Sequence, residues 1–192
     1  MRSTNGNFGN DTIRFGLETI KNVGTNIVEA IIAEREAGGK FISLSAFAER
    51  VRHKDFNKKS LESLIKCGAL DTLGERGVLI ANLDLLLEYN RESQKNAREG
   101  QTSLFAATPD THASSLRLKV AEPAAKRDRL AWEKELLGLY VSEHPMQEYM
   151  EKLRRRKLVP LQEITTDLRN KEVTVAGLIS GIQKITTRTG EP

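Results

Sequence analysis

Two glycine turns are the parts of this sequence best suited to bind an anion. The tetrapeptide LETI begins seven residues before Gly24, and LESL begins seven residues before Gly68. Glycine lets the backbone turn tightly and places no side chain over the turn. Amide groups around such a turn, and those that open the next helix, then point outward at the positive end of the helix dipole. That arrangement suits a phosphate group, including one of a DNA backbone.

Basic residues near both turns would add charged contacts to such a site. Lys21 and Lys66 adjoin the turns, and the interval from Arg50 to Lys66 holds six basic residues against two acidic ones. The net charge of the chain is only +4, so the prediction rests on this clustering rather than on the total charge. The residues that we expect to contact DNA are Lys21, Asn22, Val23, Gly24, Thr25, Asn26, Lys58, Lys59, Lys66, Cys67, Gly68 and Ala69.

Other site chemistries find no support in the sequence. The three histidines are scattered, and Cys67 is the only cysteine, which excludes an intrachain disulfide and a cysteine zinc cluster. No glycine-rich phosphate loop and no Ser-His-Asp set is present, so we expect no catalytic residue, metal or cofactor. No apolar run approaches the roughly 18 residues of a membrane span, and no signal peptide opens the chain. We therefore expect a cytoplasmic protein without a membrane partner.

The pattern of apolar residues predicts a mainly α-helical protein. Ser43 and Asn57 are expected helix N-caps, whereas Gly38-Gly39 and Gly68 are expected helix ends. Each glycine turn lies between a short apolar helix and a second amphipathic helix, predicted at Ile27–Glu36 and at Val78–Tyr89. Two unrelated helical hairpins would give the same pattern. The shared spacing favours a tandem helix-hairpin-helix unit, in which the two hairpins grip the backbones of a duplex without reading its bases.

The flanking segments have a different character. We expect a flexible lead-in at residues 1–12, the tandem helix-hairpin-helix domain at 13–90, and a polar linker at 91–125. A helical connector is expected at 126–170, with one helix from Lys126 to Tyr140 and another, after a break at Pro145, that runs through Lys157. The apolar residues of 171–192 then alternate with small or polar ones, which is typical of a β-strand.

Long stretches of the chain resemble the bacterial replicative DNA polymerase III alpha subunit family. IRFGLETIKNVG and FNKKSLESLIKCGALDTLGERGVLIANLD are similar to the region that follows the fingers of these polymerases. WEKELLGLYVSEHPMQEY resembles their helical connector, and KEVTVAGLISGIQKITTRTGEP the opening of their OB-fold domain. Asn22 departs from the family pattern IKGVG, in which many relatives carry glycine. The resemblance implies a fragment of such a subunit whose β part is an incomplete OB fold, with the polymerase carboxylates upstream of it.

The resemblance also implies a role for an apolar pair in the polar linker. These polymerases carry a clamp-binding peptide, Gln-x-x-Leu/Met-Phe, between the hairpins and the OB fold. The expected clamp-binding residues here are Gln101, Thr102, Ser103, Leu104 and Phe105. An extended peptide of this kind would place Leu104 and Phe105 in one groove of the sliding clamp, the beta subunit.

The resemblance predicts a non-catalytic fragment whose partners are double-stranded DNA, the sliding clamp and the rest of the polymerase III holoenzyme. Two other functions fit the residues. A tandem-hairpin domain of a repair or recombination protein would bind DNA without binding the clamp, and a structural scaffold would bind neither. The sequence leaves a replicative enzyme and an error-prone paralogue equally open.

Overall fold

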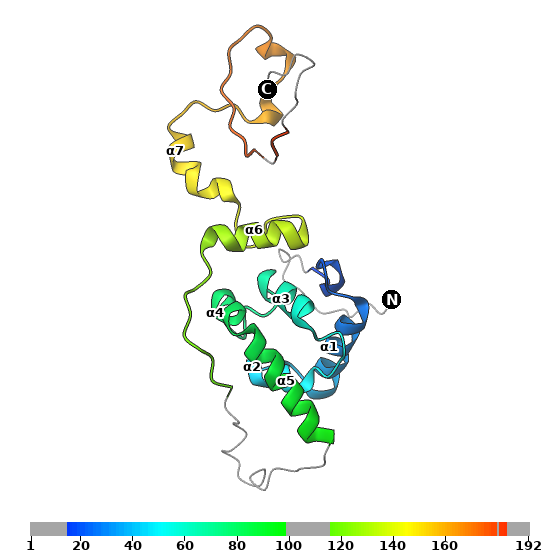
Figure 1. The fold of residues 1–192 in the computed structure, drawn as a ribbon. Coiled ribbons are helices and arrows are strands. Elements are labelled where there is room, and N and C mark those ends of the chain that lie inside the picture. Colours follow the sequence, from blue (N-terminus) through cyan, green and yellow to red (C-terminus); the bar gives the residue numbers. More distant parts are fainter. Residues whose placement is uncertain (1–14, 99–115, 180, 184–192) are drawn as a thin grey trace, which may run out of the picture. The chain divides into compact units, whose positions relative to one another are not determined.

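Helices make up nearly all of the regular structure in residues 15–98, 116–179 and 181–183, which a computed structural model describes (Figure 1). The α-helices are α1 (Thr25–Gly38), α2 (Leu44–Arg50), α3 (Lys58–Lys66), α4 (Arg76–Ala81), α5 (Leu83–Arg98), α6 (Lys126–Leu137) and α7 (Met150–Arg154). Short 3₁₀ turns are η1 (Leu17–Thr19), η2 (Pro145–Tyr149), η3 (Leu161–Glu163) and η4 (Thr166–Leu168). The chain divides into two compact units, Met1–Val141 and Ser142–Pro192. The prediction of a mainly helical protein is confirmed.

The helix ends follow the capping residues that the sequence offers. The Ser43 side chain accepts a hydrogen bond from the Ala46 amide, and Asn57 forms a reciprocal capping box with Ser60. Gly39 and Gly68 have φ values of 72° and 85°, a left-handed conformation that strains any residue with a side chain. The N-caps and helix ends predicted at these positions are therefore confirmed.

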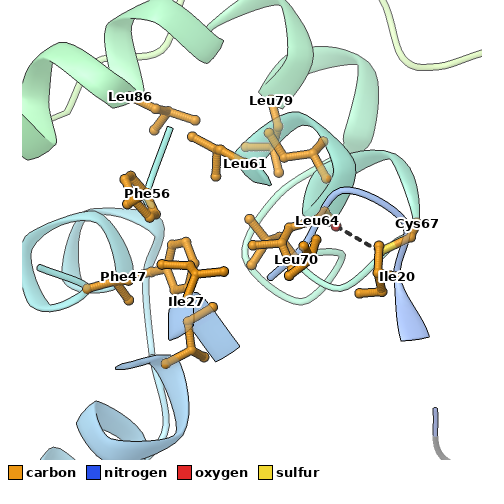
Figure 2. Close-up of a cluster of buried hydrophobic side chains, with 14 of the residues drawn as sticks. Ile20, Ile27, Phe47, Phe56, Leu61, Leu64, Cys67, Leu70, Leu79 and Leu86 are labelled. Atoms are coloured by element: carbon orange, nitrogen blue, oxygen red, sulfur yellow. Dashed lines mark hydrogen bonds between the residues drawn. The ribbon is translucent and has the colours of Figure 1, made fainter. Parts of the chain in front are cut away.

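The hydrophobic core of the first unit is built around α3 (Figure 2). Leu61, Leu64 and Ile65 of this helix are at most 1% exposed. Side chains from Ile20, just after η1, through Leu86 of α5 surround them, as the labelled residues of Figure 2 show. Cys67 lies among them and donates a hydrogen bond from its thiol to the Leu64 carbonyl oxygen at 3.3 Å. Burial raises the pKa of this thiol, so Cys67 acts as a small core residue.

The predicted second helix of the second hairpin is interrupted. Instead of one helix over 78–89, α4 ends at Ala81 and α5 begins at Leu83, with Asn82 between them at φ −107°. Asn82 is 1% exposed, and its side chain exchanges two hydrogen bonds with the main chain of Lys119, at 2.9 Å and 2.7 Å. A buried side-chain amide requires such partners. The interruption between α4 and α5 therefore coincides with the contact between Asn82 and Lys119.

Residues 116–125, here called the return segment, lie along α4 rather than in a free linker. Leu116 and Leu118 pack against the core. At Gly77 a Cβ would lie 2.4 Å from backbone atoms of Glu122 and Ala124. The absent side chain thus permits close backbone contact. The expected linker at 91–125 is therefore helix α5 at its start and a packed extended segment at its end.

Helix α6 belongs to the first unit and packs against α3. The Lys21 amide donates to the Leu136 carbonyl oxygen at 3.0 Å, which ties the end of α6 to the first hairpin. The helix ends at Leu137 instead of Tyr140, because Gly138 turns the backbone left-handed at φ 77°. The structure thus groups α6 with the hairpins and not with the connector expected at 126–170.

The second unit contains little regular structure among its described residues. The predicted helix through Lys157 is present as η2 and the short α7. Leu158 and Thr174 form an isolated parallel bridge, and the Val159 amide donates to the Thr174 carbonyl oxygen at 2.9 Å. Within residues 171–179 and 181–183 no strand extends this bridge, so the β-strand predicted for 171–192 has no counterpart in that part of the chain.

Candidate nucleic-acid interface

The first hairpin turns through Asn22. Its φ of 69° is the left-handed conformation that glycine adopts most easily and that asparagine tolerates better than other residues. The Val23 amide closes the turn by donating to the Ile20 carbonyl oxygen at 3.1 Å. The Asn22 side chain lies 3.4 Å from the Ser63 hydroxyl, within hydrogen-bond distance. Asparagine therefore fits the position where the family pattern has glycine.

Gly24 precedes α1 and leaves the amides of its first turn open. It has an extended backbone, with φ −81° and ψ 158°, and it is the N-cap of α1 without a side-chain hydrogen bond. The first turn contains no acidic residue. Gly24, Thr25 and Asn26 are all exposed. The positive end of a 14-residue helix thus faces solvent, and among the residues that the structure describes no N-cap side chain accepts from its first amides.

Lysines on two segments flank this helix end. Asn26 contacts Asp55 at 3.3 Å, and Asn22 contacts Ser63, so α3 runs beside the hairpin. Lys59 lies one turn before Ser63 on that helix and is exposed. Lys21, within the turn itself, is also exposed. Lys21 thus lies three residues before Gly24, and Lys59 lies on the helix that Asn22 contacts.

The other two predicted lysines have partners within the protein. The Lys66 ammonium lies 2.5 Å from Glu62 and 5.5 Å from the centre of the Trp132 ring. Lys58 points to Asp84 at 2.8 Å, and the hydrogen bond and charge of that carboxylate raise the pKa of the lysine. Lys66 remains on the α6 side of the hairpin, whereas Lys58 belongs to the contact between α3 and α5.

The second hairpin is closed to an anion. The amides of Cys67, Gly68 and Ala69 donate to the carbonyl oxygens of Ser63, Ile65 and Leu64, each at 3.0 Å. These bonds end α3, with Gly68 in the left-handed conformation. The prediction of outward-pointing, unpaired amides is wrong for these residues. The equal spacing from LETI and LESL does not distinguish the two glycines, although Gly24 precedes the start of a helix and Gly68 follows the end of one.

The helix that follows the second hairpin is capped by the chain's own carboxylate. Glu75 accepts hydrogen bonds from the amides of Gly77 at 2.7 Å, Val78 at 3.1 Å and Ala124 at 2.9 Å. Partial burial opposes ionisation, but these amides and the charge of Arg129 outweigh it. The pKa of Glu75 is therefore lowered. The two hairpins thus differ: of the helices that follow them, α4 is capped by a described carboxylate and α1 by none.

A buried ion-pair network ties the second hairpin to α6. Arg76 is 6% exposed and Glu133 is 0% exposed, and their side chains meet at 2.9 Å. Arg76 also binds Asp71 at 2.8 Å and the Lys66 carbonyl oxygen at 3.1 Å. The second Glu133 oxygen accepts from the Val141 amide at 2.8 Å. Nothing local to α6 marks Glu133 for this role, because its partner Arg76 lies 57 positions away.

Comparison with known proteins identifies the family to which these hairpins correspond. The helix-hairpin-helix motif family matches residues 2–78. The chain is 37% identical over 183 residues to DNA polymerase III subunit alpha of Thermus aquaticus, which covers 94% of the chain and 15% of that relative. The corresponding proteins of Borreliella burgdorferi and Deinococcus radiodurans are both 38% identical, over 92% and 94% of the chain. The chain belongs to the DNA polymerase III subunit alpha family.

This membership confirms the resemblance predicted from the sequence, over a limited part of the relatives. The chain spans 14–16% of the length of these DNA polymerase III alpha subunits. The predicted clamp-binding residues, 101–105, lie outside the described residues. Among the described residues, no group of three or more His, Cys, Asp or Glu side chains could hold a metal ion. No helix in the same ranges is long and apolar enough to span a membrane.

Proposed function

We propose that this part of a DNA polymerase III alpha subunit holds duplex DNA by one phosphate backbone, at the N-terminus of α1. The open amides after Gly24 carry the proposal, because they provide donors and the positive end of a helix dipole. Exposed Lys21 and Lys59 would add charge beside them. Such contacts hold DNA in any sequence and weaken with salt.

An acidic cap in place of Gly24 separates binding from folding. Gly24→Asp would satisfy the amides of α1 from within the chain, as Glu75 does for α4, and a Cβ at Gly24 meets no atom within 4 Å. We expect an unfolding free energy that is equal to or up to about 1 kcal/mol above that of the parent chain. The affinity for duplex DNA should fall at least about tenfold, as the carboxylate repels phosphate.

Gly24→Asn is the matched control, since it caps the helix with a neutral side chain. We expect it to weaken binding less than Gly24→Asp does, when both are measured by fluorescence anisotropy on two unrelated duplexes at several salt concentrations. Unchanged affinity in Gly24→Asp would contradict the proposed site. A chain that binds no duplex even at low salt would support a structural scaffold.

The second proposed activity is tethering of the polymerase to its sliding clamp through Gln101–Phe105. The match of these residues to the clamp-binding pattern of the family supports it. Burial of Leu104 and Phe105 in a groove of the clamp would stabilise the complex by about 1.5–3 kcal/mol for each side chain. Replacement of both by alanine should therefore lower clamp affinity on the order of a hundred-fold or more, measured by titration.

The same double variant should unfold at the same urea concentration as the parent chain. Leu104 and Phe105 would fill a groove of the clamp and not the core of this chain. If Leu104 and Phe105 instead belong to the chain's own core, the double variant should lose several kcal/mol of stability and should bind the clamp normally.

A tandem-hairpin repair protein is the alternative function, which predicts DNA binding without clamp binding. We place the protein in the cytoplasm, as a non-catalytic part of a longer DNA-synthesising enzyme and its holoenzyme.

A further inference from the structure

An apolar groove lies on the first unit, at the far end of α1 from Gly24. Its volume is about 430 Å³, within the range of ligand sites. Leu17, Ile31, Leu64 and Leu70 form part of its floor. Phe15, at its edge, is 44% exposed to solvent. The groove therefore combines a core-like floor with an accessible opening.

The charged residues that line the groove are all cationic. Arg35 and Lys40 are exposed, and no acidic side chain among the described residues lines the groove. Arg35 lies one turn after Ile31 on α1, so both side chains lie on the same face of the helix. The nearby Glu34 is paired with Arg50 at 3.6 Å and does not neutralise this edge.

The two aromatic residues inside the groove, Phe41 and Phe47, are not free to stack on nucleic-acid bases. The Phe41 ring meets Phe47 edge-on at a centroid distance of 5.1 Å. The Arg50 guanidinium covers one face of the Phe41 ring at 4.5 Å. Phe47 itself is buried. Aliphatic side chains of a partner fit such a floor better than planar bases do.

We propose that this groove docks an acidic, apolar peptide segment of a partner protein. Leucine or phenylalanine side chains of that segment fill the floor, and its carboxylates pair with Arg35 and Lys40. The charge complementarity at the rim selects this occupant over a basic peptide. Arg35 is about 16 Å along α1 from Gly24, at 1.5 Å per residue, so peptide and DNA bind the chain at the same time.

A short fluorescein-labelled peptide that alternates leucine or phenylalanine with glutamate is the probe. We expect it to bind the full chain, and its isomer with lysine in place of glutamate to bind at least about tenfold more weakly. Methyl signals of Ile31, Leu64 and Leu70 should shift in NMR spectra on binding, and those of Leu86, which does not line the groove, should not.

Charge reversal at the rim provides the matched comparison. Arg35→Glu/Lys40→Glu should lower affinity for the acidic peptide at least about tenfold, whereas Arg52→Glu/Lys54→Glu, the same change elsewhere on the surface, should not. Both variants should melt like the parent, since the four side chains are exposed. No binding of the acidic peptide, equal loss in both variants, or displacement by duplex DNA would overturn the proposal. Self-association that Arg35→Glu/Lys40→Glu abolishes would instead identify a second copy as the occupant.

Discussion

At the scale of single residues, Arg76 connects three parts of the first unit. Its guanidinium binds the loop after α3 through Asp71, the end of α3 through the Lys66 carbonyl oxygen, and α6 through Glu133. The partners are unequal, since the Asp71 side chain is 49% exposed and Glu133 is fully buried. A buried carboxylate without its cation is strongly destabilising, while the whole pair adds much less to stability.

This inequality predicts non-additive effects of substitutions. Glu133→Leu should lower the unfolding free energy by about 3 kcal/mol, because Arg76 then loses its buried partner and the Val141 amide loses its acceptor. The double variant Arg76→Met/Glu133→Leu should lose less than the sum of the two single variants. Urea denaturation of the four proteins measures the difference.

Glu135→Leu is the control for this cycle, since Glu135 is an exposed residue of the same helix. It should change the unfolding free energy by no more than about 0.5 kcal/mol. Equal losses in the Glu133 and Glu135 variants, or strict additivity in the cycle, would show that the ion pair does not hold α6.

At the scale of elements, the join between α4 and the return segment depends on a carboxylate. Glu75 binds two amides of α4 and the amide of Ala124. Because the folded protein lowers the pKa of Glu75, the ionised form favours the folded state. This stabilisation is present above the ordinary carboxyl pKa and is lost as the pH falls through the lower folded value.

We therefore expect the Ala124 amide to exchange its hydrogen faster in acid, relative to the intrinsic rate, as Glu75 becomes protonated. Glu75→Gln keeps an accepting oxygen but does not titrate. In this variant the protection of the Ala124 amide against exchange should therefore not decrease in acid. Hydrogen exchange at Ala124, measured by NMR at a series of pH values in the parent protein and in Glu75→Gln, tests this prediction. Identical pH profiles in both proteins would rule out Glu75 as the titrating group.

The sequence predicted those elements whose signals are local. Ser43, Asn57 and Gly39 mark helix ends through bonds or dihedral angles that span a few residues, and the structure agrees with each. Asn82 and Glu133 carry no such signal, because their partners lie 37 and 57 positions away. Helix periodicity therefore continued through Asn82, and the buried role of Glu133 was missed.

The sequence also could not predict which glycine of the candidate site has open amides beside it. Spacing alone made Gly24 and Gly68 look equivalent, yet their φ values of −81° and 85° give one an open helix start and the other a closed helix end. The left-handed residue of the first hairpin is Asn22, which in the sequence stands out only as a departure from the family pattern. Backbone conformation, which spacing does not encode, decides which amides are open.

At the scale of the whole molecule, the boundary between units follows α6. The first unit ends at Val141, after the contacts of α6 with Arg76 and with the first hairpin. Limited proteolysis should therefore cut close to Ser142 before it cuts between residues 125 and 126. A purified product of residues 1–141 should melt at the same temperature as the first unit of the full chain. Early cleavage before α6 would support the connector boundary expected from the sequence.

Both flanks of residues 99–115 are attached to the first unit. Helix α5 leads into this interval, and the return segment leaves it with Lys119 bonded twice to Asn82. A clamp bound within this interval would therefore load the first unit, which we propose to hold DNA, through two attachments, α5 and the Asn82 bonds. Force between a bound clamp and bound DNA would then be carried within the first unit and would not cross its boundary at Ser142.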